Sequence, residues 1–300
     1  RSDRHRAWVN IILGCNNFCT YCIVPYVRGR EHSRKMEDVL SEIRELAGDG
    51  CREITLLGQN VNSYGNDLGE KDLFAKLLYA VEEIPGIDRV RFMTSHPKDL
   101  SDALIDAVKN CKKVCRHLHL PVQSGSSRIL KLMNRKYTRE QYLSLVEKIK
   151  REIPDIALST DIIVGFPGET DEDFEDTLDV VRRVGFDSAF MFIYSPRKGT
   201  PAAKLEQTTP PDVISRRFKK LLDLQTGIAT DLAKRFEGKT VEVLADGPSK
   251  QNPAMFSGRT CTNHLVNFEG GDIQKGDMAA VEIVRAGAFW LEGKGGRKIG

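Results

Sequence analysis

The sequence has no fourth cysteine close to the three that share its one cysteine-rich loop. Cys15, Cys19 and Cys22 directly follow the apolar segment 8–13, and the chain holds seven cysteines in all. This odd number disfavours a framework of disulfide bonds, which a chain of 300 residues does not need for stability. A zinc site usually takes a second pair of cysteines or histidines, so zinc stays open as an alternative. The candidates for that second half are Cys111, Cys115, His117 and His119.

Long apolar runs and a strong net charge are also missing. The longest apolar run covers about residues 189–194, whereas a membrane-spanning helix needs about 20 residues. The net charge is +3, which neither requires nor excludes a nucleic-acid partner. The N-terminus has no initiator methionine and no secretory apolar region, and it resembles the interior of a longer protein. We expect no membrane partner and a location in the reducing cytoplasm.

The first two thirds of the chain alternate short β-branched runs with amphipathic segments. One helical pattern begins at Met36, another at Thr138 with Gln141 completing a capping box, and a third after Thr170. The runs are nearly continuous in apolar residues, as expected for parallel strands buried on both faces. They cover residues 9–13, 53–58, 89–95, 117–122, 156–165 and 186–195. We therefore predict an α/β fold with a partial (β/α)6 barrel, two units short of the closed eight-stranded form.

The last part of the chain has a different pattern. A long helical segment over about 212–236 is followed by short strands separated by glycine turns. We expect a linker at 1–7, a barrel with its terminal helix at 8–236, and a small all-β, OB-like barrel at 237–300. The small domain has as many basic as acidic side chains, so its charge does not identify a partner.

The cysteine loop indicates an incompletely ligated metal cluster. A four-iron cluster has four irons, so three thiolates leave one iron free to bind another molecule. The C-x3-C-x2-C spacing resembles that of the radical S-adenosylmethionine (SAM) enzymes. This resemblance implies a [4Fe-4S] cluster on Cys15, Cys19 and Cys22, with SAM capping the open iron. It also implies that an electron from the reduced cluster cleaves SAM to a 5′-deoxyadenosyl radical, and that Tyr21 packs against the adenine.

Six further segments resemble the tRNA methylthiotransferases. They are GCNNFCTYCIVPYVRG, LLGQNVNSYG, FMTSHP, HLPVQSGS, DIIVGFPGET and SGRTCTNHLVNFEG. LLGQNVN resembles the members that add a methylthio group to carbon 2 of isopentenyladenosine, next to the tRNA anticodon. Sister enzymes act on threonylcarbamoyladenosine or on an aspartate of a ribosomal protein. The C-terminal domain resembles the family's TRAM module, which docks on tRNA.

Several polar and glycine residues stand where the predicted strands end, at the face of a barrel where active sites form. We expect them, with Tyr21, to contact SAM or the incoming base, with Asp161 on a ribose hydroxyl. His119 has a second interpretation, as a hydrogen-bonded histidine of the barrel interior, and Gln59 and Asn60 as an ordinary polar loop. The set comprises Gln59, Asn60, Ser95, His96, His119, Gln123, Asp161, Gly165 and Phe166.

Four cations after the cysteine loop are candidates for binding RNA phosphates. They are Arg28, Arg30, Arg34 and Lys35, and a solvated surface is the alternative. Of the other cysteines, Cys51, Cys111 and Cys115 precede strands and Cys261 lies in the small domain. We expect these four to be thiols without a metal.

The resembled enzymes carry a preceding domain with three more cysteines and a second [4Fe-4S] cluster, which this sequence lacks. We expect the chain to bind one cluster and cleave SAM, but not to complete methylthiolation alone. The expected partners are the tRNA anticodon stem-loop, a low-potential donor such as flavodoxin or ferredoxin, and a sulfur donor. The alternative from another class is a non-catalytic, metal-stabilised RNA-binding protein.

Overall fold

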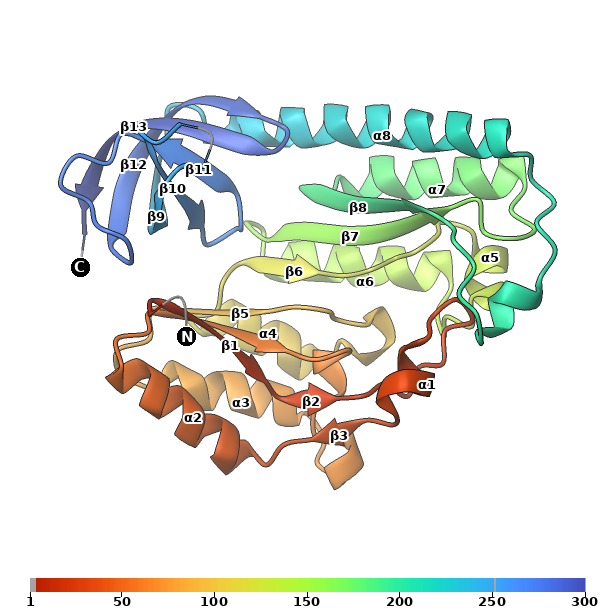
Figure 1. The fold of residues 1–300 in the computed structure, drawn as a ribbon, viewed down its shortest axis with the longest axis horizontal. Coiled ribbons are helices and arrows are strands. Elements are labelled where there is room, and N and C mark those ends of the chain that lie inside the picture. The colour runs from red at the N-terminus through yellow and green to blue at the C-terminus, as the bar shows by residue number, and fades with distance from the viewer. Residues whose placement is uncertain (1–3, 251, 300) are drawn as a thin grey trace.

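The computed structural model describes residues 4–250 and 252–299, and its larger part is an open barrel of six parallel strands (Figure 1). Strands β1, β4 and β5 form one sheet, and β6, β7 and β8 form another, each in chain order. Their bounds are β1 Arg6–Asn10, β4 Glu53–Leu57, β5 Arg89–Phe92, β6 His117–His119, β7 Ala157–Val164 and β8 Ser188–Ile193. The predicted partial (β/α)6 barrel is confirmed.

The two sheets meet where β5 approaches the segment before β6. Val90 forms a parallel bridge with Val114, its N–H donates to the Lys113 carbonyl at 2.7 Å, and its carbonyl accepts from Cys115 N at 2.9 Å. Further along, Ser95 N donates to the His119 carbonyl at 3.3 Å. These few hydrogen bonds join the two three-stranded sheets into one continuous partial barrel.

Helices cover the outside of the barrel and bury apolar side chains against the strands (Figure 1). They are α2 Met36–Gly48, α3 Leu73–Glu82, α4 Asp102–Asn110, α6 Arg139–Glu152, α7 Asp171–Val184 and α8 Pro211–Ala233. The capping box predicted at Thr138 is present, and Thr170 forms another with Asp173. Among the described residues, none of these helices offers an apolar stretch sufficient to traverse a lipid bilayer.

Short elements occupy the connections. They are the helices α1 Val24–Arg28 and α5 Ser127–Leu132, and the 3-10 turns η1 Val61–Ser63, η2 Asn66–Leu68, η3 Pro97–Asp99, η4 Pro201–Lys204 and η5 Lys234–Phe236. The predicted strand 9–13 is interrupted in the structure: after β1, Ile12–Leu13 forms the separate strand β2, antiparallel to β3 His32–Ser33. This small ladder closes the base of the cysteine loop, which runs between its two strands.

The small domain is a closed five-stranded barrel with its own apolar core. Its strands are β9 Thr240–Pro248, β10 Phe256–Thr260, β11 Leu265–Phe268, β12 Met278–Gly287 and β13 Trp290–Lys298, in the order β10-β11-β13-β12-β9. All pairs are antiparallel except β11 with β13. The expected small β-barrel is confirmed, since alternating side chains of these strands fill its interior.

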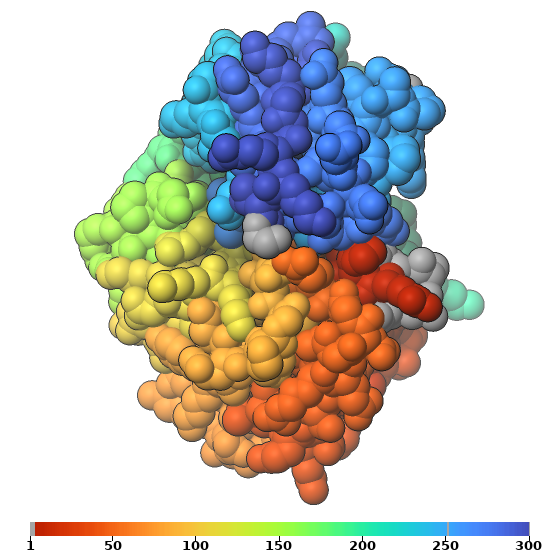
Figure 2. Space-filling view, turned by 90° about the vertical axis from the view of Figure 1, so that its left-hand side faces the viewer, coloured from red at the N-terminus to blue at the C-terminus, as the bar shows by residue number. Residues whose placement is uncertain are grey.

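Two arginines of β5, the buried Arg89 and the largely buried Arg91, hold the small domain at the end where the barrel strands begin. Arg89 donates to the carbonyls of Arg259 at 2.6 Å and Glu242 at 3.0 Å, and Arg91 donates to Thr260 O at 2.7 Å. Figure 1 shows this end on the left, with α1 and the cysteine loop on the right, and Figure 2 shows the small domain in blue resting on it.

Candidate active site

The three cysteines of the predicted cluster lie together in the loop between β2 and α1. Cys15 and Cys19 are buried and Cys22 is half-buried, and all three are free thiols. Burial raises the pKa of the Cys15 and Cys22 thiols, and the nearby Cys19 sulfur adds to both shifts.

Two nitrogen donors point at these sulfurs. Asn17 Nδ2 lies 3.5 Å from Cys15 Sγ, and Arg135 Nη1 lies 3.5 Å from Cys19 Sγ. Arg135 is buried and also donates to the Pro121 carbonyl at 2.9 Å. Hydrogen bonds to sulfur favour the thiolate over the thiol and set the potential of an iron–sulfur cluster. In the sequence, Arg135 stands between Asn134 and Lys136 and could not be told from a surface cation.

The donor set fits a four-iron cluster. Among the described residues, no group of three or more cysteine, histidine or acidic side chains is placed to bind one metal ion. A four-iron cluster makes a different demand, because each cysteine sulfur binds a separate iron. Three free thiols in one loop, two of them receiving N–H donors, meet that demand.

A pocket of about 320 Å³ lies at the carboxyl ends of β7 and β8, beside this loop. Tyr21, Gln123 and Asp161 of the predicted set line it. The other side of the pocket, which comes from the end of β8 and the segment after it, was not predicted from the sequence. The lining residues on that side are Phe192, Ile193, Tyr194, Ser195 and Arg197. Four of these five residues lie at the end of the predicted strand 186–195, and that position was the available signal.

Three polar atoms at the same end of the barrel are buried and lack a partner among the described residues. They are Gln59 Oε1, Ser95 Oγ and the Tyr194 hydroxyl. A buried polar atom without a hydrogen bond is costly, so it marks a place where a ligand or water completes the site. Gln59 and Ser95 belong to the predicted set, whereas Tyr194 does not.

Other predicted residues are already hydrogen-bonded within the protein. The Asn60 amide donates to Asp99 Oδ2 at 2.7 Å and accepts from His96 N at 3.1 Å. His119 Nδ1 lies 3.0 Å from Ser159 Oγ, and its Nε2 lies 3.5 Å from Asp161 Oδ1. This geometry matches the barrel-interior interpretation of His119, which here orients the pocket carboxylate.

His96 and Gln123 have constrained surroundings. Burial, with smaller contributions from Arg135 and Lys98, lowers the pKa of His96 to about 2, so the ring is neutral. Its Nδ1 accepts from Lys98 N at 3.2 Å. Gln123 has a left-handed backbone with φ of 69°, held by its bonds to the backbone of β7. Strained backbone of this kind concentrates at functional sites.

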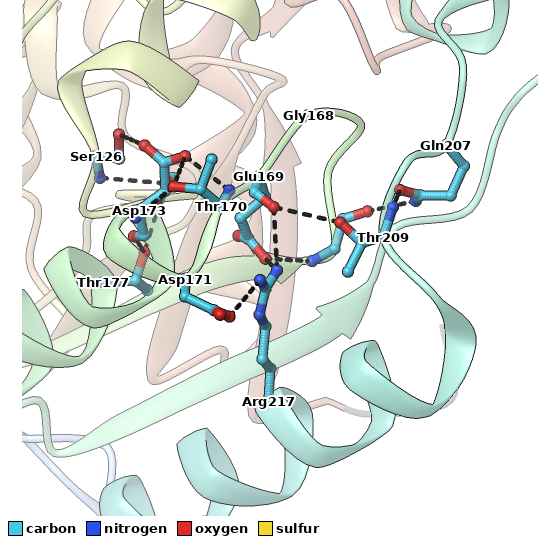
Figure 3. Close-up of polar contacts among 12 residues, drawn as sticks. Ser126, Gly168, Glu169, Thr170, Asp171, Asp173, Thr177, Gln207, Thr209 and Arg217 are labelled. Atoms are coloured by element: carbon cyan, nitrogen blue, oxygen red, sulfur yellow. Dashed lines mark hydrogen bonds and ion pairs between the residues drawn. The ribbon is translucent and has the colours of Figure 1, made fainter.

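The turn after β7 is held by a buried ionic network (Figure 3). Gly165 has φ of 71°, its N–H donates to Glu169 Oε2 at 2.9 Å, and its carbonyl accepts from Gln207 Nε2 at 2.8 Å. Arg217 of α8 lies 3.1 Å from the same Glu169 oxygen. Phe166 is fully buried and packs edge-on against Tyr194, with ring centroids 5.3 Å apart. Phe166 thus packs against a residue that lines the pocket, while hydrogen bonds fix the Gly165 backbone next to it.

The four predicted RNA-binding cations divide into two kinds. Arg28, Arg30 and Lys35 are exposed, and Arg30 lies over the Phe18 ring at 4.7 Å. Arg34 instead pairs with Glu42 at 2.6 Å and donates to the Asn10 carbonyl at 2.9 Å. Its guanidinium therefore stabilises the start of α2, and three cations remain on the surface beside the cysteine loop.

The remaining cysteines lie away from this loop and are free thiols. Cys51 and Cys111 are buried near the beginnings of β4 and β6. Cys115 and Cys261 meet at the joint between the two domains, where the Cys115 thiol hydrogen-bonds to Cys261. Cys261 Sγ also accepts from Arg116 N at 3.2 Å.

Comparisons with known proteins agree with this architecture. Residues 9–181 match the Radical SAM superfamily model, and residues 234–294 match the TRAM domain model. Among solved structures, the radical S-adenosylmethionine methyltransferase TsrM from Kitasatospora setae, with cobalamin and a [4Fe-4S] cluster bound, aligns with a TM-score of 0.54 at 19% identity. The alignment covers 66% of this chain and 36% of that chain. At this identity the likeness concerns the fold alone.

Curated relatives are much closer in sequence. The tRNA-2-methylthio-N(6)-dimethylallyladenosine synthase of Acetivibrio thermocellus is 59% identical over 98% of this chain. The protein of the same name from Carboxydothermus hydrogenoformans is 58% identical over 96% of this chain. This chain spans 61% and 66% of the lengths of these two relatives.

Proposed function

Since the chain belongs to the radical SAM superfamily, which uses a four-iron cluster and SAM, we propose that it is the SAM-cleaving and RNA-contacting part of a tRNA methylthiotransferase. Its substrate is isopentenyladenosine next to the tRNA anticodon, and the product is the 2-methylthio derivative. The observation that carries the proposal is the identity of 58–59% to synthases of that modification, extending across both domains.

The cluster site is assigned to Cys15, Cys19 and Cys22. These three thiolates would hold a four-iron cluster, which when bound would supply the electron for reductive cleavage of SAM. Asn17 and Arg135 stabilise the charge on two sulfurs by hydrogen bonding. Adenine C2 carries no leaving group, so removal of its hydrogen by a radical opens a reaction that an ionic route does not.

The pocket beside the cluster loop is assigned to SAM and the reacting nucleoside. The Asp161 carboxylate, oriented by His119, is an acceptor for ribose hydroxyls. Tyr21 and Tyr194 provide aromatic faces for a purine, and Gln59 Oε1 and Ser95 Oγ provide hydrogen-bonding atoms that the protein leaves unused. The exposed Arg28, Arg30 and Lys35 are assigned to RNA phosphates.

The complete conversion is proposed for the longer protein. The relatives extend beyond the matched region, and we assign to their remaining part the second cluster and the delivery of sulfur. One SAM molecule donates the methyl group and another provides the radical. A low-potential flavodoxin or ferredoxin supplies electrons, a separate donor replenishes sulfur, and the reaction takes place in the cytoplasm.

Anaerobic reconstitution of the chain with iron and sulfide tests the proposal. We expect about four irons per chain, a change in the electron paramagnetic resonance spectrum of the reduced protein when SAM is added, and 5′-deoxyadenosine as a product. Cys19→Ala should lose the cluster, whereas Cys111→Ala, at the opposite end of the barrel, should retain it. One bound zinc in place of iron and sulfide, or a spectrum indifferent to SAM, refutes the assignment.

The substrate is tested separately with the longer protein and defined tRNAs. Isopentenylated tRNA should yield the 2-methylthio nucleoside, measured by mass spectrometry of nuclease digests, and threonylcarbamoylated tRNA should not. The reverse preference would identify a sister methylthiotransferase. Multiple turnovers to the methylthio product by this chain alone would contradict the division of labour between its domains and the remaining part of the protein.

A further inference from the structure

A second pocket lies where β8 meets the small domain, at the end of the barrel opposite the cysteine loop. Its volume is about 410 Å³, within the range of pockets that hold small molecules. One wall comes from His117 of β6 and the first half of β8. The other comes from two turns of the small domain, one between β10 and β11 and one between β12 and β13. The pocket therefore exists only because the two domains are docked.

Two aromatic rings line this pocket and remain largely open to solvent. Phe190 of β8 is 53% exposed and Phe289 of the β12–β13 turn is 65% exposed. Aromatic side chains are usually among the more buried residues, so two open rings on one concave surface mark a binding site. Rings presented in this way bind flat ligands by stacking.

The polar groups of the pocket are mostly neutral. Burial lowers the pKa of His117 to about 3 and lowers that of His264, so both rings are uncharged at neutral pH. The Asn263 side chain makes no hydrogen bond to another described residue, although its carbonyl accepts from Arg259 Nη1 at 2.9 Å. An unoccupied amide offers both a donor and an acceptor to a ligand.

The charged groups of the lining offset each other. Among the described residues around the pocket, Arg259 is the one cation and Asp187 the one carboxylate. Asp187 Oδ1 lies 3.6 Å from His264 Nε2 and also pairs with Arg235 at 2.5 Å. A balanced charge is unsuited to selective phosphate binding, whereas stacking rings and an amide suit an uncharged heteroaromatic ring.

We propose that this pocket, defined by Phe190, Asn263 and Phe289, binds one unpaired base of the RNA substrate, distinct from the base that reacts. The ligand class rests on the proposed function, since it takes the substrate to be RNA. Bases of single-stranded loops are recognised by being turned out, stacked on aromatic side chains and hydrogen-bonded at their edges. The pocket provides both kinds of contact.

The inward face of β8 connects this pocket with the one beside the cysteine loop. The Phe190 ring packs edge-on against His119, with centroids 5.9 Å apart, and His119 contacts Asp161 of the other pocket. Phe192, two residues further along β8 and on the same face, lines that other pocket and is 51% exposed. From Phe190 to Ser195 the chain advances about 17 Å, so the two pockets receive different nucleotides of one strand.

Fluorescence anisotropy with a labelled, isopentenylated anticodon stem-loop RNA tests the inference on the reconstituted chain. Phe289→Ala should weaken RNA binding at least about fivefold, the loss expected for one stacked base. Asn263→Ala should also weaken it, because this change removes the amide that hydrogen-bonds to the edge of the base. Tyr79→Ala removes an aromatic ring of α3 that is 43% exposed and serves as the matched control with unchanged binding. Phe289 and Asn263 lie in turns of the small domain, so formation of 5′-deoxyadenosine without RNA should be unchanged.

An RNA series with one abasic nucleotide at each loop position identifies the bound base. Loss of the base at one loop position should weaken RNA binding by the unaltered chain. The same loss should not weaken RNA binding by Phe289→Ala any further, because both changes remove the same contact. Equal RNA binding by all variants overturns the inference, as does a reduced salt dependence in Phe289→Ala, which would indicate phosphate binding. Failure of the unaltered chain to bind RNA also overturns it. If the longer protein binds RNA but forms no methylthio product, the proposed function is refuted. The RNA affinities of Phe289→Ala and Asn263→Ala still decide whether this pocket binds a base.

Discussion

Replacing Arg217 by methionine should destabilise the barrel strongly, because it would leave a buried carboxylate without its cation. The side chains of Arg217 and Glu169 are 8% and 1% exposed, with Arg217 Nη1 3.1 Å from Glu169 Oε2. Removing one partner of a buried ion pair costs about 3–5 kcal/mol, since the remaining charge keeps its desolvation penalty. Arg217 also donates to the Glu169 carbonyl at 3.2 Å, so the turn after β7 loses a second bond (Figure 3).

The measurement is urea-induced unfolding of the chain, followed by circular dichroism of its helices. Arg216→Met is the matched control, because Arg216 is the adjacent residue of α8 and is 74% exposed. Among the residues that the structure describes, its one ion pair is with Asp212 on the same helix, a contact worth a few tenths of a kcal/mol. The double change Glu169→Gln with Arg217→Met should recover part of the loss, because a neutral amide is cheaper to bury than a carboxylate.

The loss of stability in Arg217→Met should depend on pH. Burial raises the pKa of Glu169 even with Arg217 present, and loss of Arg217 raises it further. A carboxyl with a raised pKa in the folded state destabilises the fold as the pH rises through that pKa. The deficit of Arg217→Met should therefore shrink as the pH falls and Glu169 takes up a proton. A deficit below about 1 kcal/mol at neutral pH, equal to that of Arg216→Met, would show that the pair does not hold the turn.

Two further predictions concern the joint between the domains. The hydrogen bond from the Cys115 thiol lowers the pKa of Cys261 from 9.0 to about 6, so its thiolate should stabilise the fold above pH 9 and lose that effect as the pH falls to about 6. The free energy of unfolding, measured across this range, should therefore rise with pH more steeply in the unaltered chain than in Cys261→Ser. Equal slopes in the two proteins would refute the thiolate. Arg89→Met removes donors from the carbonyls of Arg259 and Glu242 and should weaken docking of the small domain by about 1–3 kcal/mol. Limited proteolysis should then cleave the segment after α8 faster, and an unchanged rate would assign the docking to other contacts.

Local sequence patterns were sufficient for the order of the elements. Nearly continuous apolar runs predicted the six parallel strands, because a strand buried on both faces has no polar side. The strand β8 is the exception, since its apolar run remains partly exposed on the inward face. Thr138 with Gln141 predicted the start of α6, since a capping box involves only neighbouring residues. The spacing of Cys15, Cys19 and Cys22 likewise places three thiols in one short loop whatever the surrounding fold does.

Contacts between distant segments decided the rest of the site. Arg135 reaches Cys19, and Arg217 reaches Glu169, only after segments far apart in the sequence pack together, and neither arginine differs locally from a surface cation. The same holds for Asn60, Arg34 and Phe166, whose predicted contacts with ligands depend on side-chain atoms that the fold has already used or buried. The pocket between Phe190 and Phe289 joins two domains, so no single segment carries its pattern. Short-range periodicity and spacing thus determined which elements form and where the thiols stand, whereas three-dimensional packing determined which polar groups remain free for a ligand.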